Sequence, residues 1–367
     1  MMVVRLRLMR SRRIARFRCS ACLLAALLAL AMPLWAQMAP SPDAAPQGPA
    51  TSPDQNAQQQ PMETLKVNVN LVSLYFTVHD KHGALIPGLA KNDFTIYEDK
   101  VPQTIKNFSA ETDQPLTLGI MLDTSGSQQR VLPMEQQAGT EFLQRILRSK
   151  DEAFLISFDV DIDLLADYTN NARELERAMD KAQINVGTGG GGIPGMGQGP
   201  LPSSDVPRGT LLYDAVYLAA NTKLAQETGR KALILLTDGE DQGSREKPDE
   251  AIAAAQKANA IIYVILIADR PFYTGGGGFQ MGYSGDAAMR KLTAATGGRV
   301  IDVGNNGKKL AQAFAQIEAE LRTQYVASYT PTNDKLDGTY RRVEVQCKEN
   351  DLKAQVRQGY YAIATSN

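Results

Sequence analysis

Three oxygen-bearing side chains, Asp123, Ser125 and Ser127, stand on alternate residues directly after the apolar run 116–122. An apolar run that ends in a turn of small residues predicts a buried strand followed by a loop. Alternate residues of an extended turn project to one side, so a carboxylate and two hydroxyls are expected together. These hard donors suit Mg²⁺, Mn²⁺ or Ca²⁺ better than Zn²⁺. The pentapeptide alone also fits an ordinary helix N-cap loop.

Two later segments add donors of the same kind. Thr210 precedes an expected helix in the segment 208–215, and Asp238 ends a second apolar run, 231–237. Each also has a simpler interpretation, a helix cap for Thr210 and a turn for Asp238. Open α/β sheets bind ligands beyond the carboxyl ends of their strands, where the strand order reverses. The sequence therefore predicts one metal site from three loops, with the residues Asp123, Ser125, Ser127, Thr210 and Asp238.

Taken together, the three segments resemble the von Willebrand factor type A domain. Its metal-ion-dependent adhesion site is written Asp-x-Ser-x-Ser, then Thr, then Asp, and all five residues occur here in that order. The resemblance implies that Ser125 and Ser127 bind the ion directly, and that Thr210 binds directly or through water. It implies that Asp123 and Asp238 mostly hold coordinating waters. Mg²⁺ is the expected ion, with Mn²⁺ and Ca²⁺ as alternatives.

Segments on both sides of these loops narrow the resemblance. The stretches 92–99, 321–325 and 359–361 are similar to the exported bacterial VWFA-related family, which is named for its abundance in acidobacterial proteomes. The resemblance extends over nearly all of the chain beyond residue 63. Because the biochemical role of that family is poorly defined, the resemblance implies a fold more strongly than a function.

The elements that must position these loops alternate between strand and helix. Over 115–324, buried strands and amphipathic helices predict an α/β fold, a doubly wound and mostly parallel sheet. The expected strands are 116–122, 153–158, 162–166, 232–237, 261–267 and 299–301. The expected helices are 135–148, 172–182, 211–225, 248–259, 286–296 and 308–322. The strand 162–166 follows a tight connection, so we expect it to be an antiparallel edge.

Short alternating runs flank this domain, over 63–112 and 325–362. Each set has too few strands for a stable core of its own. We expect the two sets to pair in one antiparallel β-sandwich with the α/β domain inserted between them.

The first residues have the pattern of an export signal. A basic stretch precedes the apolar run 22–35, so residues 1–36 are expected to be a signal peptide. An uncleaved N-terminal membrane anchor is the alternative. Residues 37–62 are rich in Pro, Gln, Ala and Ser, which predicts a disordered linker. The mature chain is expected to be periplasmic or secreted.

Composition and the remaining motifs exclude several function classes. The chain of 367 residues is 43% hydrophobic with a formal net charge of −1, so electrostatics give no argument for nucleic acid. Only two histidines occur, His79 and His82, and neither lies near the expected loops. The spacing Asp159-x-Asp161-x-Asp163 resembles a calcium loop, but a strand hairpin that turns Val160, Ile162 and Leu164 inward fits better.

The leading hypothesis is an exported, non-enzymatic binding module. A largely neutral set of ligands leaves the ion positively charged with one open position, which a Glu or Asp carboxylate of a protein partner can fill. The alternatives are a metal-assisted hydrolase and a structural protein of the cell envelope. A hydrolase needs a general base near the metal, and the sequence offers no histidine there.

Overall fold

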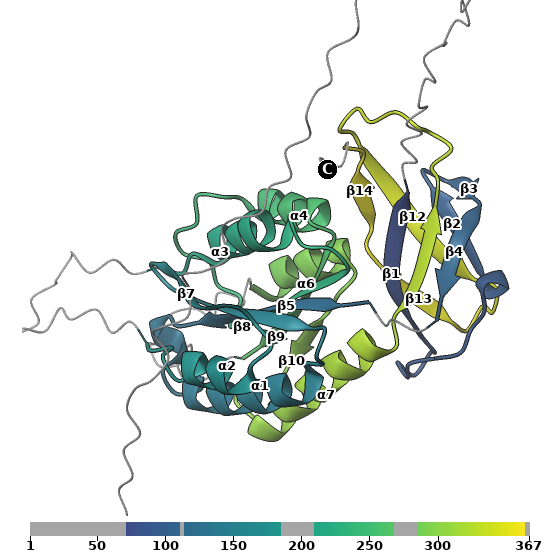
Figure 1. Cartoon of the computed structure of the whole chain (residues 1–367). Helices are drawn as coiled ribbons and strands as arrows, with labels where there is room; N and C mark the ends of the chain where they lie inside the picture. The colour runs from purple at the N-terminus through teal and green to yellow at the C-terminus, as the bar shows by residue number, and fades with distance from the viewer. Residues whose placement is uncertain (1–70, 111–113, 185–208, 268–284, 364–367) are drawn as a thin grey trace, which may run out of the picture. The chain divides into compact units, whose positions relative to one another are not determined.

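The computed structural model describes residues 71–110, 114–184, 209–267 and 285–363 (Figure 1). The expected signal peptide 1–36, the linker 37–62 and the glycine-rich stretch 187–199 lie outside the described residues. No helix in the described part of the chain is long and apolar enough to cross a membrane.

A six-stranded sheet forms the centre of the α/β part, with the strand order β10-β9-β8-β5-β6-β7. Its strands are β5 (Leu116–Asp123), β6 (Glu152–Phe158), β7 (Ile162–Thr169), β8 (Arg230–Thr237), β9 (Ala260–Leu266) and β10 (Val300–Asp302). All neighbouring pairs are parallel except β6 with β7. The chain runs outward from β5 through β6 to β7, then returns to β8 on the other side. The strand order therefore reverses between β5 and β8, as a doubly wound sheet requires.

Helices cover both faces of this sheet (Figure 1). On one face lie α1 (Leu132–Ile146), α2 (Ala172–Met179) and α7 (Gly307–Arg322). On the other face lie α3 (Leu212–Leu218), α4 (Pro248–Lys257) and α6 (Gly285–Thr296). Side chains of a strand alternate between faces, so Leu118 and Ile120 of β5 join the first core and Met121 joins the second. Burial of β5 on both faces explains its continuous apolar sequence.

Two four-stranded antiparallel sheets form the second part, with the orders β13-β1-β11-β4 and β14-β12-β2-β3. The strands are β1 (Val72–His79), β2 (Phe94–Glu98), β3 (Val101–Gln103), β4 (Ile105–Ser109), β11 (Tyr325–Tyr329), β12 (Tyr340–Cys347), β13 (Lys353–Val356) and β14 (Gly359–Tyr361). Each sheet mixes strands from before and after the α/β part. β1 pairs with both β11 and β13, and β2 pairs with β12. A shared apolar core includes Leu74, Phe76 and Tyr325. The fold class expected from the sequence is therefore confirmed.

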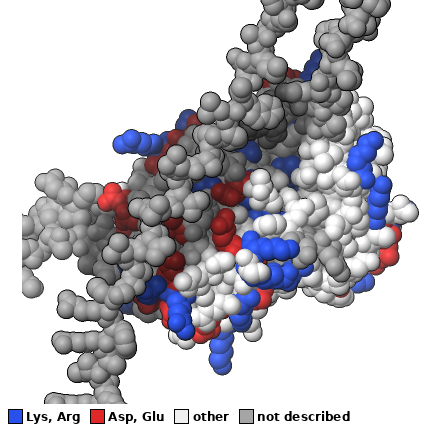
Figure 2. Space-filling view, viewed as in Figure 1, with Lys and Arg blue, Asp and Glu red and all other residues white. Residues whose placement is uncertain are grey.

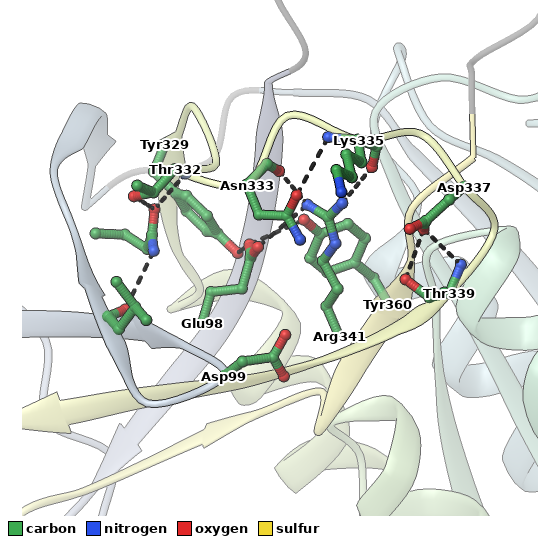
Figure 3. Close-up of polar contacts among 12 residues, drawn as sticks. Glu98, Asp99, Tyr329, Thr332, Asn333, Lys335, Asp337, Thr339, Arg341 and Tyr360 are labelled. Atoms are coloured by element: carbon green, nitrogen blue, oxygen red, sulfur yellow. Dashed lines mark hydrogen bonds and ion pairs between the residues drawn. The ribbon is translucent and has the colours of Figure 1, made fainter.

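A buried ion pair connects the two halves of this sandwich (Figure 3). Glu98 of β2 accepts hydrogen bonds from Arg341 of β12 at 3.2 Å, from Tyr329 at 2.7 Å and from Tyr360 at 2.9 Å. Arg341 also donates to the backbone carbonyls of Asn333 and Lys335, which follow β11. Glu98 is 3% exposed and Arg341 1%. The pair thus joins strands on both sides of the inserted domain.

Two details differ from the expected elements. The helix expected over 211–225 is divided into α3 and a wider π-helical segment, η3 (Ala219–Leu224). The hairpin β6–β7 was expected to turn Leu164 inward, and this was wrong, because Leu164 is 49% exposed. β7 is an edge strand, and its pairing with β6 shifts register between Leu155 and Ile156. This shift breaks the simple alternation on which the expectation was based.

Candidate metal centre

Asp123 is the last residue of β5 and is fully buried. Its Oδ1 accepts a hydrogen bond from the backbone N–H of Ser125 at 3.0 Å, and its Oδ2 accepts one from the Thr237 hydroxyl at 2.6 Å. Thr237 ends β8, the parallel neighbour of β5. The Asp123 carboxylate is therefore held between two strand ends, at the point where the strand order reverses.

Ser125 and Ser127 lie in the loop that leaves β5. Their hydroxyl oxygens are 3.0 Å apart, and both side chains are half-buried. The short 3₁₀ turn η2 (Gly126–Gln128) follows Ser125 and brings the two hydroxyls to the same side. The loop after β5 thus carries Asp123, Ser125 and Ser127 together, and their role as metal ligands stays a prediction.

Asp238 follows β8 and is 2% exposed. Its Oδ1 accepts a hydrogen bond from the backbone N–H of Glu240 at 3.1 Å. The intervening Gly239 has φ +81°, a left-handed conformation that glycine adopts without strain. The loop therefore turns sharply and keeps the Asp238 carboxylate at the strand end.

The two aspartates are close enough to affect each other. Burial is the main cause that raises the pKa of Asp123 to about 7, and the neighbouring charge of Asp238 raises it further. Hydrogen bonds from Ser125 and Thr237 act in the opposite direction and only partly offset these effects. Two buried carboxylates of the same sign favour either a proton or a bound cation.

Backbone hydrogen bonds connect the Thr210 loop to this region. Thr210 is 6% exposed, and its carbonyl accepts a hydrogen bond from the N–H of Gln242 at 3.0 Å. The next residue, Leu211, donates its N–H to the carbonyl of Asp159 at 2.8 Å. The Asp159 side chain in turn accepts a hydrogen bond from the Thr124 hydroxyl at 2.8 Å. Asp159 therefore joins the Thr210 loop to the Ser125 loop.

Several residues at the site were not singled out as contributors from the sequence. Asp159 was considered only as part of a hairpin or calcium loop. Asp241 accepts a hydrogen bond from the N–H of Leu212 at 3.1 Å. Gln128 and Glu135 are 1% and 0% exposed. Glu135 had a detectable signal, because it lies three residues after Leu132 on the inward stripe of α1. A charged residue at a core position of a helix indicates a role beyond packing.

The residues fit a hard divalent cation. The described part of the chain contains no group of three or more His, Cys, Asp and Glu side chains that would hold a metal ion by themselves. The donors gathered here are instead hydroxyl and carboxylate oxygens, which suit Mg²⁺, Mn²⁺ and Ca²⁺. A cation would also compensate the buried charges of Asp123 and Asp238.

The buried charge of the centre contrasts with the outer surface. On the face shown in Figure 2, acidic and basic side chains of the described residues are interspersed. Interspersed charges largely cancel beyond about 8 Å at physiological ionic strength. The enclosed carboxylates are screened much less, so their charge acts mainly on an ion within the site.

No family model and no curated protein matches the chain. Among solved structures, it is similar to the conserved hypothetical protein BatB from Bacteroides thetaiotaomicron, with 17% identity, a TM-score of 0.40, and coverage of 56% of this chain and 98% of the other. It is similar to the vWF domain of the type V pili tip protein Mfa5 from Porphyromonas gingivalis, with 13% identity, a TM-score of 0.40, and coverage of 57% and 95%.

A third similar structure is proximal thread matrix protein 1 from the mussel byssus, with a zinc-occupied MIDAS motif. The identity is 14% and the TM-score 0.43, and the match covers 61% of this chain and 50% of the other. The chain thus spans about half the length of that protein. The fold described above rests on the strand order of this chain, and the candidate centre rests on its own residues.

Proposed function

We propose that the protein is an exported, non-enzymatic binding module that captures an acidic group of a protein partner through a divalent cation. Asp123, Ser125, Ser127, Thr210 and Asp238 would hold the ion. Mg²⁺ is the expected ion, and Mn²⁺ and Ca²⁺ are alternatives.

The observation that carries this proposal is that Asp123 and Asp238 are buried, whereas Ser125 and Ser127 of the same centre, whose hydroxyl oxygens are 3.0 Å apart, are only half-buried. The charge that attracts the ion is therefore enclosed, while neutral donors face outward. A cation held this way keeps much of its charge toward solvent, where a carboxylate of the partner can complete its coordination.

Capture is tested by retaining proteins of a cell-envelope extract on the immobilised chain in Mg²⁺. Bound proteins should elute with EDTA, and the variant Asp123→Ala should retain none of them. Asp163→Ala is the matched control, because Asp163 is exposed on β7 and lies outside the centre.

The carboxylate requirement is tested on the captured protein itself. Amidation of its carboxyl groups should abolish rebinding in Mg²⁺, whereas acetylation of its lysines should not. Retention that persists in EDTA, or rebinding after amidation, contradicts the proposal. Calorimetry with Mg²⁺, Mn²⁺, Ca²⁺ and Zn²⁺ identifies the preferred ion in the same preparation.

Export and envelope association belong to the same proposal. Mass spectrometry of the mature N-terminus should find a start near Gln37 in the periplasmic or secreted fraction. An intact chain in the membrane fraction would instead support the N-terminal anchor.

A further inference from the structure

A buried acidic side chain without a hydrogen-bond partner lies at the start of α1. Glu135 is 0% exposed, and neither of its carboxylate oxygens has a partner among the described residues. Buried polar groups in proteins are almost always hydrogen-bonded, because an unsatisfied one costs about 1–3 kcal/mol, and more when charged. Glu135 therefore needs an explanation.

Its neighbourhood contains a second acceptor of this kind. Gln128, which follows Ser127, is 1% exposed, and its Oε1 also has no partner among the described residues. Its Nε2 lies 3.5 Å from the Ser127 hydroxyl and 3.5 Å from the carbonyl of Ile267. The unpartnered acceptors thus lie at the end of the turn η2 and in the first turn of α1.

Glu135 also follows the serine loop through two hydrogen-bonded turns, since its N–H donates to the Val131 carbonyl at 3.1 Å and the Val131 N–H donates to the Gln128 carbonyl at 3.0 Å. Burial is the main cause that raises its pKa well above the ordinary value, and the charges of Asp123 and Asp238 raise it further. The three carboxylates do not converge closely enough to hold an ion without other donors. Glu135 would therefore act on a bound ion through its charge and through water.

Protonation alone does not satisfy this arrangement. A proton on Glu135 removes its charge and supplies one donor, which is too few for the unpartnered oxygens of Glu135 and Gln128 together. A hydrated divalent ion provides both missing elements, since its charge offsets the carboxylates and its bound waters donate hydrogen bonds.

We propose that Glu135 is a positioning residue of the metal centre, whose buried carboxylate accepts hydrogen bonds from ion-bound water and adds negative charge that raises cation affinity. Gln128 lies beside Ser127 and provides a second acceptor for the same water. This proposal rests on the proposed function only for the presence of the ion, and it does not depend on what the ion captures.

The test measures Mg²⁺ affinity by calorimetry for the wild-type chain, Glu135→Gln, Glu141→Gln and Asp123→Ala. Glu135→Gln keeps the shape of the side chain and removes its charge, so the affinity should fall about 10- to 100-fold, as for other residues that act on a metal through its ligands. Glu141 is the matched control, because it is an exposed glutamate on the same helix. Its substitution should leave the affinity unchanged, and Asp123→Ala should abolish binding.

Thermal unfolding without and with Mg²⁺ gives a second readout. In EDTA, Glu135→Gln should fold and give the reference unfolding temperature for that variant. Its stabilisation by Mg²⁺ should be smaller than that of wild type. Substitution of a residue that only fills space in the core would change the unfolding temperature in EDTA without changing the increase caused by Mg²⁺.

The outcomes separate this proposal from the proposed function. Wild-type affinity in Glu135→Gln, with binding lost in Asp123→Ala, overturns the role of Glu135 and leaves the centre intact. If Mg²⁺ binding depends on Glu135 but no partner protein is captured, the result contradicts only the proposed function. If Glu135→Gln does not fold, Glu135→Asp replaces it: a weakened affinity supports the proposal because the carboxylate is shorter, and an unchanged affinity overturns it.

Discussion

At the scale of single residues, the candidate centre combines buried charge with neutral donors near the surface. Asp123 is fixed by the Ser125 N–H and the Thr237 hydroxyl, and burial beside Asp238 raises its pKa to about 7. A proton and a cation therefore compete for the same carboxylate. This competition makes the response to pH a property of one residue.

The stabilisation of the chain by Mg²⁺ should increase as pH rises. The pKa of Asp123 in the folded, ion-free chain lies above its unfolded value of about 3.9, so this group favours folding below that value and loses its contribution as pH rises to about 7. Mg²⁺ favours the ionised carboxylate and reverses this loss. The increase in melting temperature caused by Mg²⁺ should therefore be larger at about pH 8 than at about pH 5.5.

Differential scanning calorimetry at both pH values measures this difference. In Asp123→Ala the Mg²⁺ response should be absent at both values. Equal responses of the wild-type chain at the two pH values would show that Asp123 does not exchange a proton for the ion.

The buried ion pair of the sandwich gives a second prediction at this scale. Glu98→Ala leaves the Arg341 charge enclosed without its carboxylate and removes the acceptor of two tyrosine hydroxyls. Breaking a buried pair in this way should lower the free energy of unfolding by about 3 kcal/mol. Urea denaturation measures the change, with Glu344→Ala as control, because Glu344 is exposed on β12. A loss as small as that of the control would show that the pair contributes little.

At the scale of elements, three loops at the carboxyl edge of the sheet hold one another in place. The Thr210 loop contacts the Asp159 loop and the loop after β8 by backbone hydrogen bonds. Gly209 lies at a close approach of two loops, where a Cβ atom would come within 2.7 Å of the carbonyl oxygen of Gln242. The position of Thr210 therefore depends on a glycine that carries no donor for the ion.

Gly209→Ala should weaken Mg²⁺ binding although it leaves all five proposed donors in place. The added methyl group must push the Thr210 loop away from Gln242, because it meets a backbone carbonyl oxygen, which cannot turn aside as a flexible side chain can. Calorimetry should show a clear loss of affinity, of about tenfold or more for such a displaced donor. Gln242→Ala is the control, since only the backbone of this exposed residue takes part. If both variants bind equally well, Thr210 is not part of the centre.

At the scale of the whole molecule, the α/β domain is inserted in the sequence between two sets of strands, and these strands still form one β-sandwich. Residues 66–367 form one compact unit. Hydrogen bonds join the sandwich to the α/β part, among them Gln358 N–H to the Ala295 carbonyl at 3.1 Å and Gln355 Nε2 to the Gly297 carbonyl at 3.0 Å. The strands before the α/β part depend on those after it for both sheet partners and core.

Removal of the chain after Gln324 should expose the N-terminal strands to proteolysis. β1 would lose both of its strand partners, and β2 would lose β12. Limited trypsin digestion should cut within 71–110 in the truncated chain, while the α/β core resists and the full chain is cut at neither place. Protection of 71–110 after truncation would show that these strands are stable by themselves.

The sequence by itself determined the doubly wound sheet and the order of the five proposed donors. Apolar runs of strand length, alternating with amphipathic segments, leave few other ways to bury their surface. Flanking strands were expected for a similar reason, since short alternating runs indicate antiparallel sheets. The assignment of the donors to an ion stays a prediction, which the calorimetric experiments test.

Only the tertiary structure decided which residues contact one another across the fold and which remain exposed. The pairing of β1 with β11, the exposure of Leu164 and the link from Thr124 through Asp159 to Leu211 all join segments that are distant in sequence or irregular in register. The same holds for Glu135, whose burial depends on how α1 packs into the core on one face of the sheet. Local patterns report the face on which a side chain lies, whereas its neighbours across that face are set by packing and register.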